Sequence, residues 1–172
     1  GIIIGSGSAS FEIIRDLVEK LPVMVTPKWL ETKCQPIAVS DVIKFLSQSL
    51  FNTHTFNKNF DIGCPDILSY KQMLLGYASA RGMKRKIFIV PVMTPRLSSY
   101  WLYFVTSTSY KLAIALVNSM KIEVICRDNK LSEILNIKPI SYQKALSNTL
   151  STIKNNEIIS SWKDSFISGR LT

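Results

Sequence analysis

The sequence is poor in the residues that build disulfide frameworks and metal sites. It has three cysteines, Cys34, Cys64 and Cys126, and one histidine, His54, in 172 residues. The cysteines are odd in number and widely spaced, which excludes a disulfide framework or a C-x-x-C pair and favours a reducing compartment, the cytoplasm. No cysteine stands at ligand spacing from His54, so no metal site is expected.

Targeting and membrane signals are also missing. The chain opens with Gly-Ile-Ile-Ile-Gly and has no basic segment or small-residue cleavage site, so this opening is expected to be an internal part of a longer protein. Residues 97–120 are apolar, but serines, threonines and Lys111 interrupt them. A membrane-spanning helix needs about twenty mostly apolar residues. We therefore predict no transmembrane segment, but two buried helices over residues 95–105 and 110–119.

Catalytic motifs are absent from the chain. There is no Tyr-x-x-x-Lys, and His54 has no nucleophile nearby, so no catalytic residue is assigned. A glycine-rich stretch follows the first apolar run, but the third glycine of a dinucleotide fingerprint is replaced by Ser10. An acidic residue about twenty positions later is missing as well. A flexible strand-to-helix connection is favoured there, with phosphate binding at the helix start as the alternative.

The chain is basic, with a net charge of +9. Such a charge raises the question of nucleic acid or an anionic membrane as a partner. The basic residues are scattered, however, and the one run is Lys84, Arg85 and Lys86. Because no aromatic stacking pattern accompanies this run, a solvated turn is favoured and nucleic acid is disfavoured.

What the sequence does contain is an alternation of strands and helices, which indicates an α/β fold. Strands are predicted over residues 2–4, 23–26, 33–39, 59–63, 86–92 and 122–126, the first of them buried on both faces as in a parallel sheet. Trp29 and Leu30 are predicted to cover neighbouring structure.

Helices are predicted where apolar residues recur at helical spacing after a capping residue. The first begins after Ser8 or Ser10 and ends at Pro22. Ser40 is predicted to cap the second, with a buried stripe formed by Val39, Val42, Ile43, Leu46 and Leu50. The third carries a Ser69–Gln72 capping box and a left-handed Gly82 at its end. A short helix covers residues 131–135, and Ser141 caps the last one.

Four segments together resemble a known family. They are GIIIGSGSASFE at residues 1–12, CQPIAVSDV at 34–42, FDIGCPD at 60–66 and PVMTPRLSSYW at 91–101. In this order they resemble the second half of the atypical short-chain dehydrogenase/reductases, of the NmrA-like or complex-I-subunit-like type. The resemblance covers nearly the whole chain, and the ending SGRLT resembles a junction to a further domain.

The resemblance implies a partial Rossmann-like sheet, made of its last strands, plus a helix-rich lobe on the substrate side. The implied division is a C-terminal remnant of a Rossmann-type domain over residues 1–68 and the lobe over residues 69–172, packed together as one unit. In this family the first half carries the glycine-rich fingerprint and, in active members, the Tyr/Lys pair. NAD or NADP is therefore expected in the full-length parent, and none on this chain alone.

The resemblance also implies site residues. The backbone of the first three residues would form the edge of the cofactor site, namely Gly1, Ile2 and Ile3. The adjacent substrate cleft would be lined by Gly5, Ser6, Gly7, Ser8, Gln35 and Pro36. The physical basis is that the carboxyl ends of parallel strands form the crevice in which α/β sheets bind ligands.

Three functions stay open at this point. In the first, the parent is an NAD(P)-dependent oxidoreductase or epimerase, and this chain supplies the substrate-side wall of a site for an unknown small molecule. In the second, the parent is a non-catalytic dinucleotide sensor or scaffold. In the third, the basic run binds an anionic membrane or nucleic acid. The missing N-terminal Rossmann half is the expected partner. Because an unpaired strand edge invites pairing, the chain by itself is expected to self-associate and to be inactive.

Overall fold

The structure, a computed structural model, describes residues 1–90 and 118–155. Here the chain folds into two compact units, each built from segments that are far apart in the sequence. The first contains Gly1–Ser8, Gln35–Ile67 and Val124–Thr172, and the second contains Ala9–Cys34 and Leu68–Glu123. The predicted α/β class is confirmed. The division at residue 68 into a Rossmann-type part and a lobe stays a prediction.

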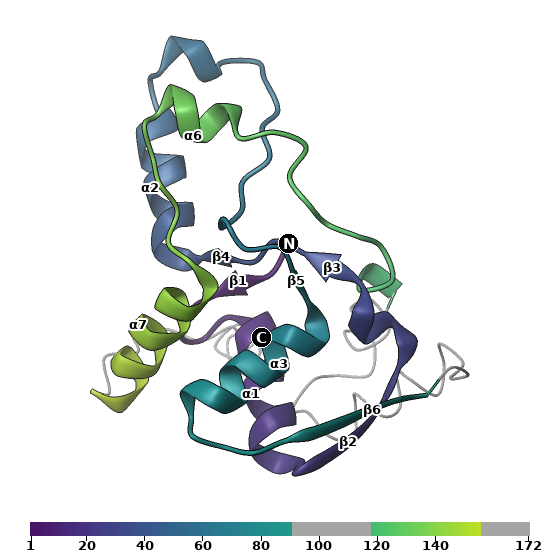
Figure 1. Cartoon of the computed structure of the whole chain (residues 1–172). Coiled ribbons are helices and arrows are strands. Elements are labelled where there is room, and N and C mark those ends of the chain that lie inside the picture. The colour runs from purple at the N-terminus through teal and green to yellow at the C-terminus, as the bar shows by residue number, and fades with distance from the viewer. Residues whose placement is uncertain (91–117, 156–172) are drawn as a thin grey trace, which may run out of the picture. The chain divides into compact units, whose positions relative to one another are not determined.

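The first unit is built on a short pair of parallel strands (Figure 1). β1 (Ile3–Ile4) lies beside β4 (Ile37–Ala38), and the N–H of Ile37 donates to the Ile2 carbonyl at 2.9 Å. α7 (Tyr142–Lys154), capped by Ser141 as predicted, packs against both strands. Ile4 is buried but Ile3 keeps 37% of its surface. The predicted strand is confirmed, whereas its burial on both faces is wrong at Ile3.

Two helices and a 3-10 turn complete the first unit. α2 (Val39–Ser49) follows β4 directly, η2 (Thr53–Thr55) comes next, and α6 (Lys130–Ile134) confirms the short helix predicted near residue 131. An apolar cluster lies beneath α2 and α6, and it consists of Ile37, Phe45, Leu131 and Ile137 with Val42, Phe60, Ile62 and Leu135 packed against them. This cluster covers the Ile37 side of the β1–β4 pair.

The second unit combines two helices with two strand pairs. α1 (Ala9–Lys20) packs against α3 (Tyr70–Ala80), and Phe11 meets Tyr77 edge-on with ring centroids 5.8 Å apart. β2 (Val23–Pro27) pairs in parallel with β6 (Lys86–Val90), and β3 (Lys33–Cys34) pairs antiparallel with β5 (Leu68–Ser69). The 3-10 helix η1 (Lys28–Glu31) buries Trp29 and Leu30, as the sequence predicted.

Local signals placed the two helices of this unit correctly. α1 begins after Ser8 and ends before Pro22. At the start of α3 the Gln72 N–H donates to the Ser69 hydroxyl at 3.2 Å, and the Ser69 N–H donates to the Gln72 side chain at 2.8 Å. Gly82 adopts φ 65°, the left-handed conformation expected just past the helix end.

The prediction for α2 is wrong in two respects. The helix begins at Val39 and its cap position is Ala38, without a side-chain hydrogen bond, so Ser40 lies inside the first turn. The predicted stripe is not buried either: Ile43, Leu46 and Leu50 are 60%, 63% and 66% exposed, and Val39 is exposed as well. The reason is that α2 packs through Phe45, which lies on a different face of the helix.

Two predicted strands do not form. Residues 59–63 carry no strand, and no backbone group of these residues makes a hydrogen bond within residues 1–90 and 118–155. From the strand predicted at 122–126 a single bridge remains, in which the Gln35 N–H donates to the Val124 carbonyl at 2.9 Å. A strand needs a ladder partner, and the described parts of the chain offer none to either segment.

Some predictions fall on residues 91–117 and 156–172. These are the helix over residues 95–105, most of the helix over 110–119, and the SGRLT ending, and they lie outside the described residues.

Candidate functional site

The carboxyl ends of β1 and β4 meet at one edge of the first unit. Because the strands are parallel, with Ile4 opposite Ala38, both lead into loops or helices on the same side. Gly5 and Ser6 follow β1, and Val39 and Ser40 follow β4. In open α/β sheets this edge is the place where ligands bind.

A tight bend closes the end of β1. The Ser8 N–H donates to the Gly5 carbonyl at 3.2 Å, and the Ser8 hydroxyl donates to the Ile3 carbonyl at 2.7 Å. A Cβ placed on Gly5 would lie 2.6 Å from the Cγ1 of Val39. Glycine is therefore required where the bend passes the start of α2.

A small cavity of about 140 Å³ opens at this edge. It lies between the two strand ends and α7, and its polar lining comes from Ser6, Ser40, Asn148 and Thr152. Sites for small-molecule ligands usually measure about 300–1,000 Å³. This cavity therefore accommodates a fragment of a ligand at most.

A larger cavity of about 560 Å³ lies at the other end of the same strands. Its lining includes Gln35, which precedes β4, together with Gly63, Cys64, Cys126 and Lys138. Its size is in the range of small-molecule sites. The site residues predicted from the sequence included Gln35 but none from the two segments, 63–67 and 126–139, that form the rest of the wall.

Gln35 ties these loops together through both ends of its amide. Its Nε2 donates to the Cys64 carbonyl at 2.9 Å, and its Oε1 accepts the Cys126 N–H at 2.6 Å. A Cβ on Gly63 would lie 2.9 Å from both the Gln35 Cβ and the Cys126 Sγ. The amide thus holds the wall of the larger cavity in place, with both of its ends engaged within the chain.

The thiols in this wall are protonated at neutral pH. Burial raises the pKa of Cys64 to about 11, and burial also raises the pKa of Cys126. Because the thiolate is the reactive form of cysteine, neither thiol is an activated nucleophile.

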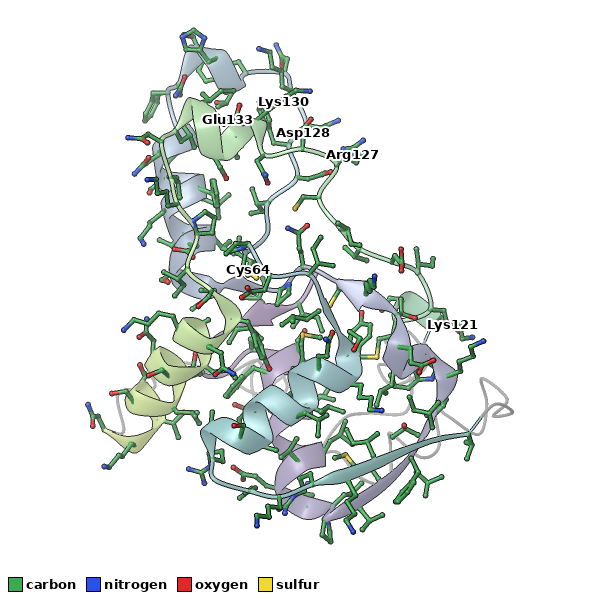
Figure 2. The ribbon with its side chains drawn as sticks, in the orientation of Figure 1. Cys64, Lys121, Arg127, Asp128, Lys130 and Glu133 are labelled. Atoms are coloured by element: carbon green, nitrogen blue, oxygen red, sulfur yellow. The ribbon has the colours of Figure 1, made fainter. Side chains whose placement is uncertain are left out.

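Two ion pairs lie at the rim of the larger cavity. Arg127 donates to Asp61 at 2.7 Å from Nε and at 3.0 Å from its second guanidinium nitrogen, and the Arg127 N–H also donates to Asp61. These bonds lower the pKa of Asp61 to about 2. Figure 2 shows Arg127 and Asp128 at the approach to α6, which carries Lys130. Asp128 pairs with Lys130 at 2.8 Å.

Two aspartates fix the entry to α7, and the sequence analysis gave neither this role. Asp41 is fully buried and accepts the Ile140 N–H at 2.8 Å, and Asp66 accepts the Tyr142 N–H at 2.7 Å. The available signal was the acidic residue in the first turn of α2, where the helix dipole favours a negative charge.

The structure distributes the predicted site residues over both cavities. Gly5 and Ser6 line the smaller one and Gln35 the larger one, whereas the remaining predicted residues are absent from the lining of either. They are Gly1, Ile2, Ile3, Gly7, Ser8 and Pro36. The Ile2 and Ile3 carbonyls are engaged within the chain, by Ile37 and Ser8, and the Pro36 carbonyl accepts the Cys64 N–H.

The cavity at the edge formed by β1 and β4 is smaller than a usual small-molecule site, and the Ile2 and Ile3 carbonyls beside it each accept a hydrogen bond within the chain. Within residues 1–90 and 118–155, no group of three or more His, Cys, Asp or Glu side chains could hold a metal ion. In the same residues no helix is both long and apolar enough to cross a membrane.

Comparisons with known proteins place the fold. No protein-family model matches the sequence. A search of curated proteins finds no match either.

Solved structures of reductases and an epimerase, in contrast, resemble this chain closely enough to superpose. A dTDP-4-dehydrorhamnose reductase from Bacillus anthracis, in complex with NADP, is 13% identical, with a TM-score of 0.56 over 86% of this chain and 45% of that one. The triphenylmethane reductase from Citrobacter sp., complexed with NADP(H), is 11% identical, with a TM-score of 0.60 over 80% and 47%. A nucleoside-diphosphate-sugar epimerase from Staphylococcus aureus is 13% identical, with a TM-score of 0.60 over 84% and 50%.

The alignments cover most of this chain but only half of the other proteins. The chain spans about half the length of the solved structures it matches. At this level of identity the likeness concerns the fold, and it agrees with the resemblance that the sequence motifs indicated. The chain has a Rossmann-like α/β fold similar to that of these reductases and this epimerase.

Proposed function

We propose that this chain is the substrate-side part of an NAD(P)-dependent reductase or epimerase. The observation that carries the proposal is the fold likeness to two reductases solved with NADP or NADP(H), which extends over 80–86% of this chain. The first half of the Rossmann domain, with the glycine-rich fingerprint and the catalytic Tyr/Lys pair, belongs to a further segment of the protein. The dinucleotide supplies or takes up the hydride when it is bound there.

The chain contributes the end of the crevice and a wall. The strand that begins with Gly1, Ile2 and Ile3 forms the cofactor edge, and the Gly5–Ser6–Gly7–Ser8 bend closes the crevice beside it. Gln35 and Pro36 hold the loops at the opposite end of the strands, around the larger cavity. Because both ends of the Gln35 amide are engaged, this residue shapes the wall and does not itself bind substrate.

Acid–base chemistry comes from outside this chain. The sequence holds no Tyr-x-x-x-Lys, and the Cys64 and Cys126 thiols stay protonated at neutral pH. The chain alone is therefore inactive, and the whole protein acts in the cytoplasm, in keeping with three widely spaced cysteines that form no disulfide framework.

Titration of NADPH and NADH into the full-length protein and into residues 1–172 tests this proposal. We expect saturable quenching or enhancement of nucleotide fluorescence with the full-length protein only. Equal affinity in the 172-residue chain, or no binding by either, would contradict the proposal. If the full-length protein binds the nucleotide but never oxidises it with any carbonyl or sugar-nucleotide substrate, dinucleotide sensing is the better description.

A further inference from the structure

A further cavity, of about 710 Å³, opens in the second unit. It lies where the chain turns from α3 into β6, beside the start of β2, and Figure 1 shows this turn between the two elements. Its apolar wall comes from Pro22, Val23, Leu75 and Ala78, and the turn at residues 82–86 contributes most of the remaining lining. The volume is within the range of small-molecule sites, and the cavity shares no residue with the two cavities of the first unit.

The turn at residues 82–86 is fixed by hydrogen bonds. The Met83 N–H donates to the Ala78 carbonyl at 2.8 Å, which closes the end of α3. Arg85 donates from Nε to the Val18 carbonyl at 2.6 Å and so ties the turn to the end of α1. The cavity is therefore bounded by an ordered backbone, and a ligand that enters it does not have to order the turn first.

Lys84 and Lys86 bring positive charge that no described carboxylate neutralises. Both residues are exposed, and neither forms an ion pair with a residue in the described parts of the chain. Other cations of this unit do have a carboxylate partner, namely Arg15, Lys20 and Arg81. Between Asp66 and Glu123 the sequence contains no acidic residue. Two such ammonium groups beside an apolar wall attract an anion.

These lysines are not required to neutralise the helix ends. The last carbonyls of a helix carry a partial negative charge, which nearby cations stabilise. Here Arg85 occupies a carbonyl at the end of α1, and backbone N–H groups of the turn occupy carbonyls at the end of α3. The ammonium groups of Lys84 and Lys86 therefore remain available to a ligand.

We infer that this cavity binds a small amphiphilic anion, in which a carboxylate or phosphate head is joined to an apolar body. Lys84 and Lys86 bind the head, since an ammonium group attracts such an anion as a compact point charge. Val23 and Leu75, which are 50% and 37% exposed, contact the apolar body and lose exposed surface when it binds. The inference goes beyond the proposed function, which uses residues of the first unit.

The shape and the charge of the site favour a small molecule over a membrane or a nucleic acid. Segments that hold an anionic membrane by charge usually carry about four to eight Lys or Arg residues. Nucleic-acid sites gain their affinity from several phosphate contacts. This cavity offers two lysines besides the engaged Arg85, and its apolar wall encloses a molecule of limited size.

Calorimetric titration of the full-length protein with three probes separates the head from the body. Octanoate carries both, acetate carries the head alone, and octan-1-ol carries the chain without a charge. We expect octanoate to bind at least about tenfold more tightly than either of the others, and its affinity should fall as the salt concentration rises. Octyl phosphate, titrated in parallel, shows which head the lysines prefer. Binding of neither amphiphilic anion would overturn the inference.

Variants at exposed positions locate the bound probe. Lys84→Gln with Lys86→Gln should weaken octanoate binding about five- to tenfold and leave the urea midpoint unchanged. Lys28→Gln with Lys33→Gln is the matched control, because it removes the same charge from exposed residues of the second unit that do not line the cavity. It should change the affinity by less than about twofold. Leu75→Gln keeps the helix propensity of α3 and should weaken octanoate binding by about threefold or more.

The outcomes separate this cavity from the nucleotide crevice and from a membrane. NADPH should leave the affinity for octanoate unchanged, and competition between the two would place the anion in the crevice and overturn the inference. Equal effects of the Lys84/Lys86 variant and its control would also overturn it. So would Lys84- and Lys86-dependent binding to phosphatidylserine vesicles without any binding of octanoate, because a membrane would then be the partner. Full-length protein that binds octanoate but no NADPH would retain this inference and refute the proposed function.

Discussion

Replacement of Gln35 by methionine tests how the wall of the larger cavity is held. Methionine keeps the length of the side chain, but it can neither donate to the Cys64 carbonyl nor accept the Cys126 N–H. Each net hydrogen bond contributes about 1 kcal/mol, and each buried group left unpaired costs about 1–3 kcal/mol. Gln35 is half-buried, so the cost of each unpaired group lies at the lower end of that range. We expect the free energy of unfolding to fall by about 2–3 kcal/mol.

Urea unfolding followed by circular dichroism gives this free energy. The midpoint should fall with an unchanged slope, and the melting temperature should drop by about 4–12 °C for a chain of this size. Gln48→Met, on the exposed side of α2, is the control and should change the free energy by less than about 0.5 kcal/mol. Equal midpoints for the two variants would refute the structural role of Gln35. In the full-length enzyme, a raised KM with unchanged stability would instead assign Gln35 to the substrate.

The two aspartates of the first unit give further predictions. Asp41→Ala leaves the Ile140 N–H without its acceptor and should cost about 2–3 kcal/mol, whereas Asp41→Asn keeps an acceptor oxygen and should cost less. Equal urea midpoints for these variants would contradict the assignment. Arg127 lowers the pKa of Asp61 from 3.8 to about 2, so the carboxylate stabilises the fold above pH 3.8, and this contribution is lost as the pH falls towards 2. Asp61→Asn should flatten the pH–stability curve in this window, and an unaltered curve would exclude the effect.

Elements with local signals could be predicted from the sequence. The Ser69–Gln72 capping box, the left-handed Gly82 and the Ser141 cap are each formed as expected, because the atoms that satisfy them lie within a few residues. The same holds for α1, where Pro22 stops the helix. These signals need no knowledge of the rest of the fold.

The site depended on contacts that no local pattern reveals. Gln35 forms hydrogen bonds with Cys64, which is 29 positions away in the sequence, and with Cys126, which is 91 positions away. Asp41 accepts the N–H of Ile140, which is 99 positions away. The family resemblance pointed to Gln35 and to the QPIAVSD segment, but only the structure shows that these side chains hold loops from distant parts of the chain. Periodicity predicts which face of a helix is apolar and cannot say which neighbour covers it.

Sequence pattern and structure disagree at two places in the first unit. The apolar stripe of α2 at Ile43, Leu46 and Leu50 and the segment 59–63 both carry the sequence pattern of buried structure. The stripe is exposed, and the backbone of the segment has no hydrogen-bond partner among the described residues. In natural sequences, local pattern and final packing usually agree, and conflicts concentrate at functional sites. Two conflicts that adjoin each other through the Phe45 cluster call for one explanation, not two. A segment that pairs with residues 59–63 and packs on Leu46 and Leu50 would remove both conflicts at once.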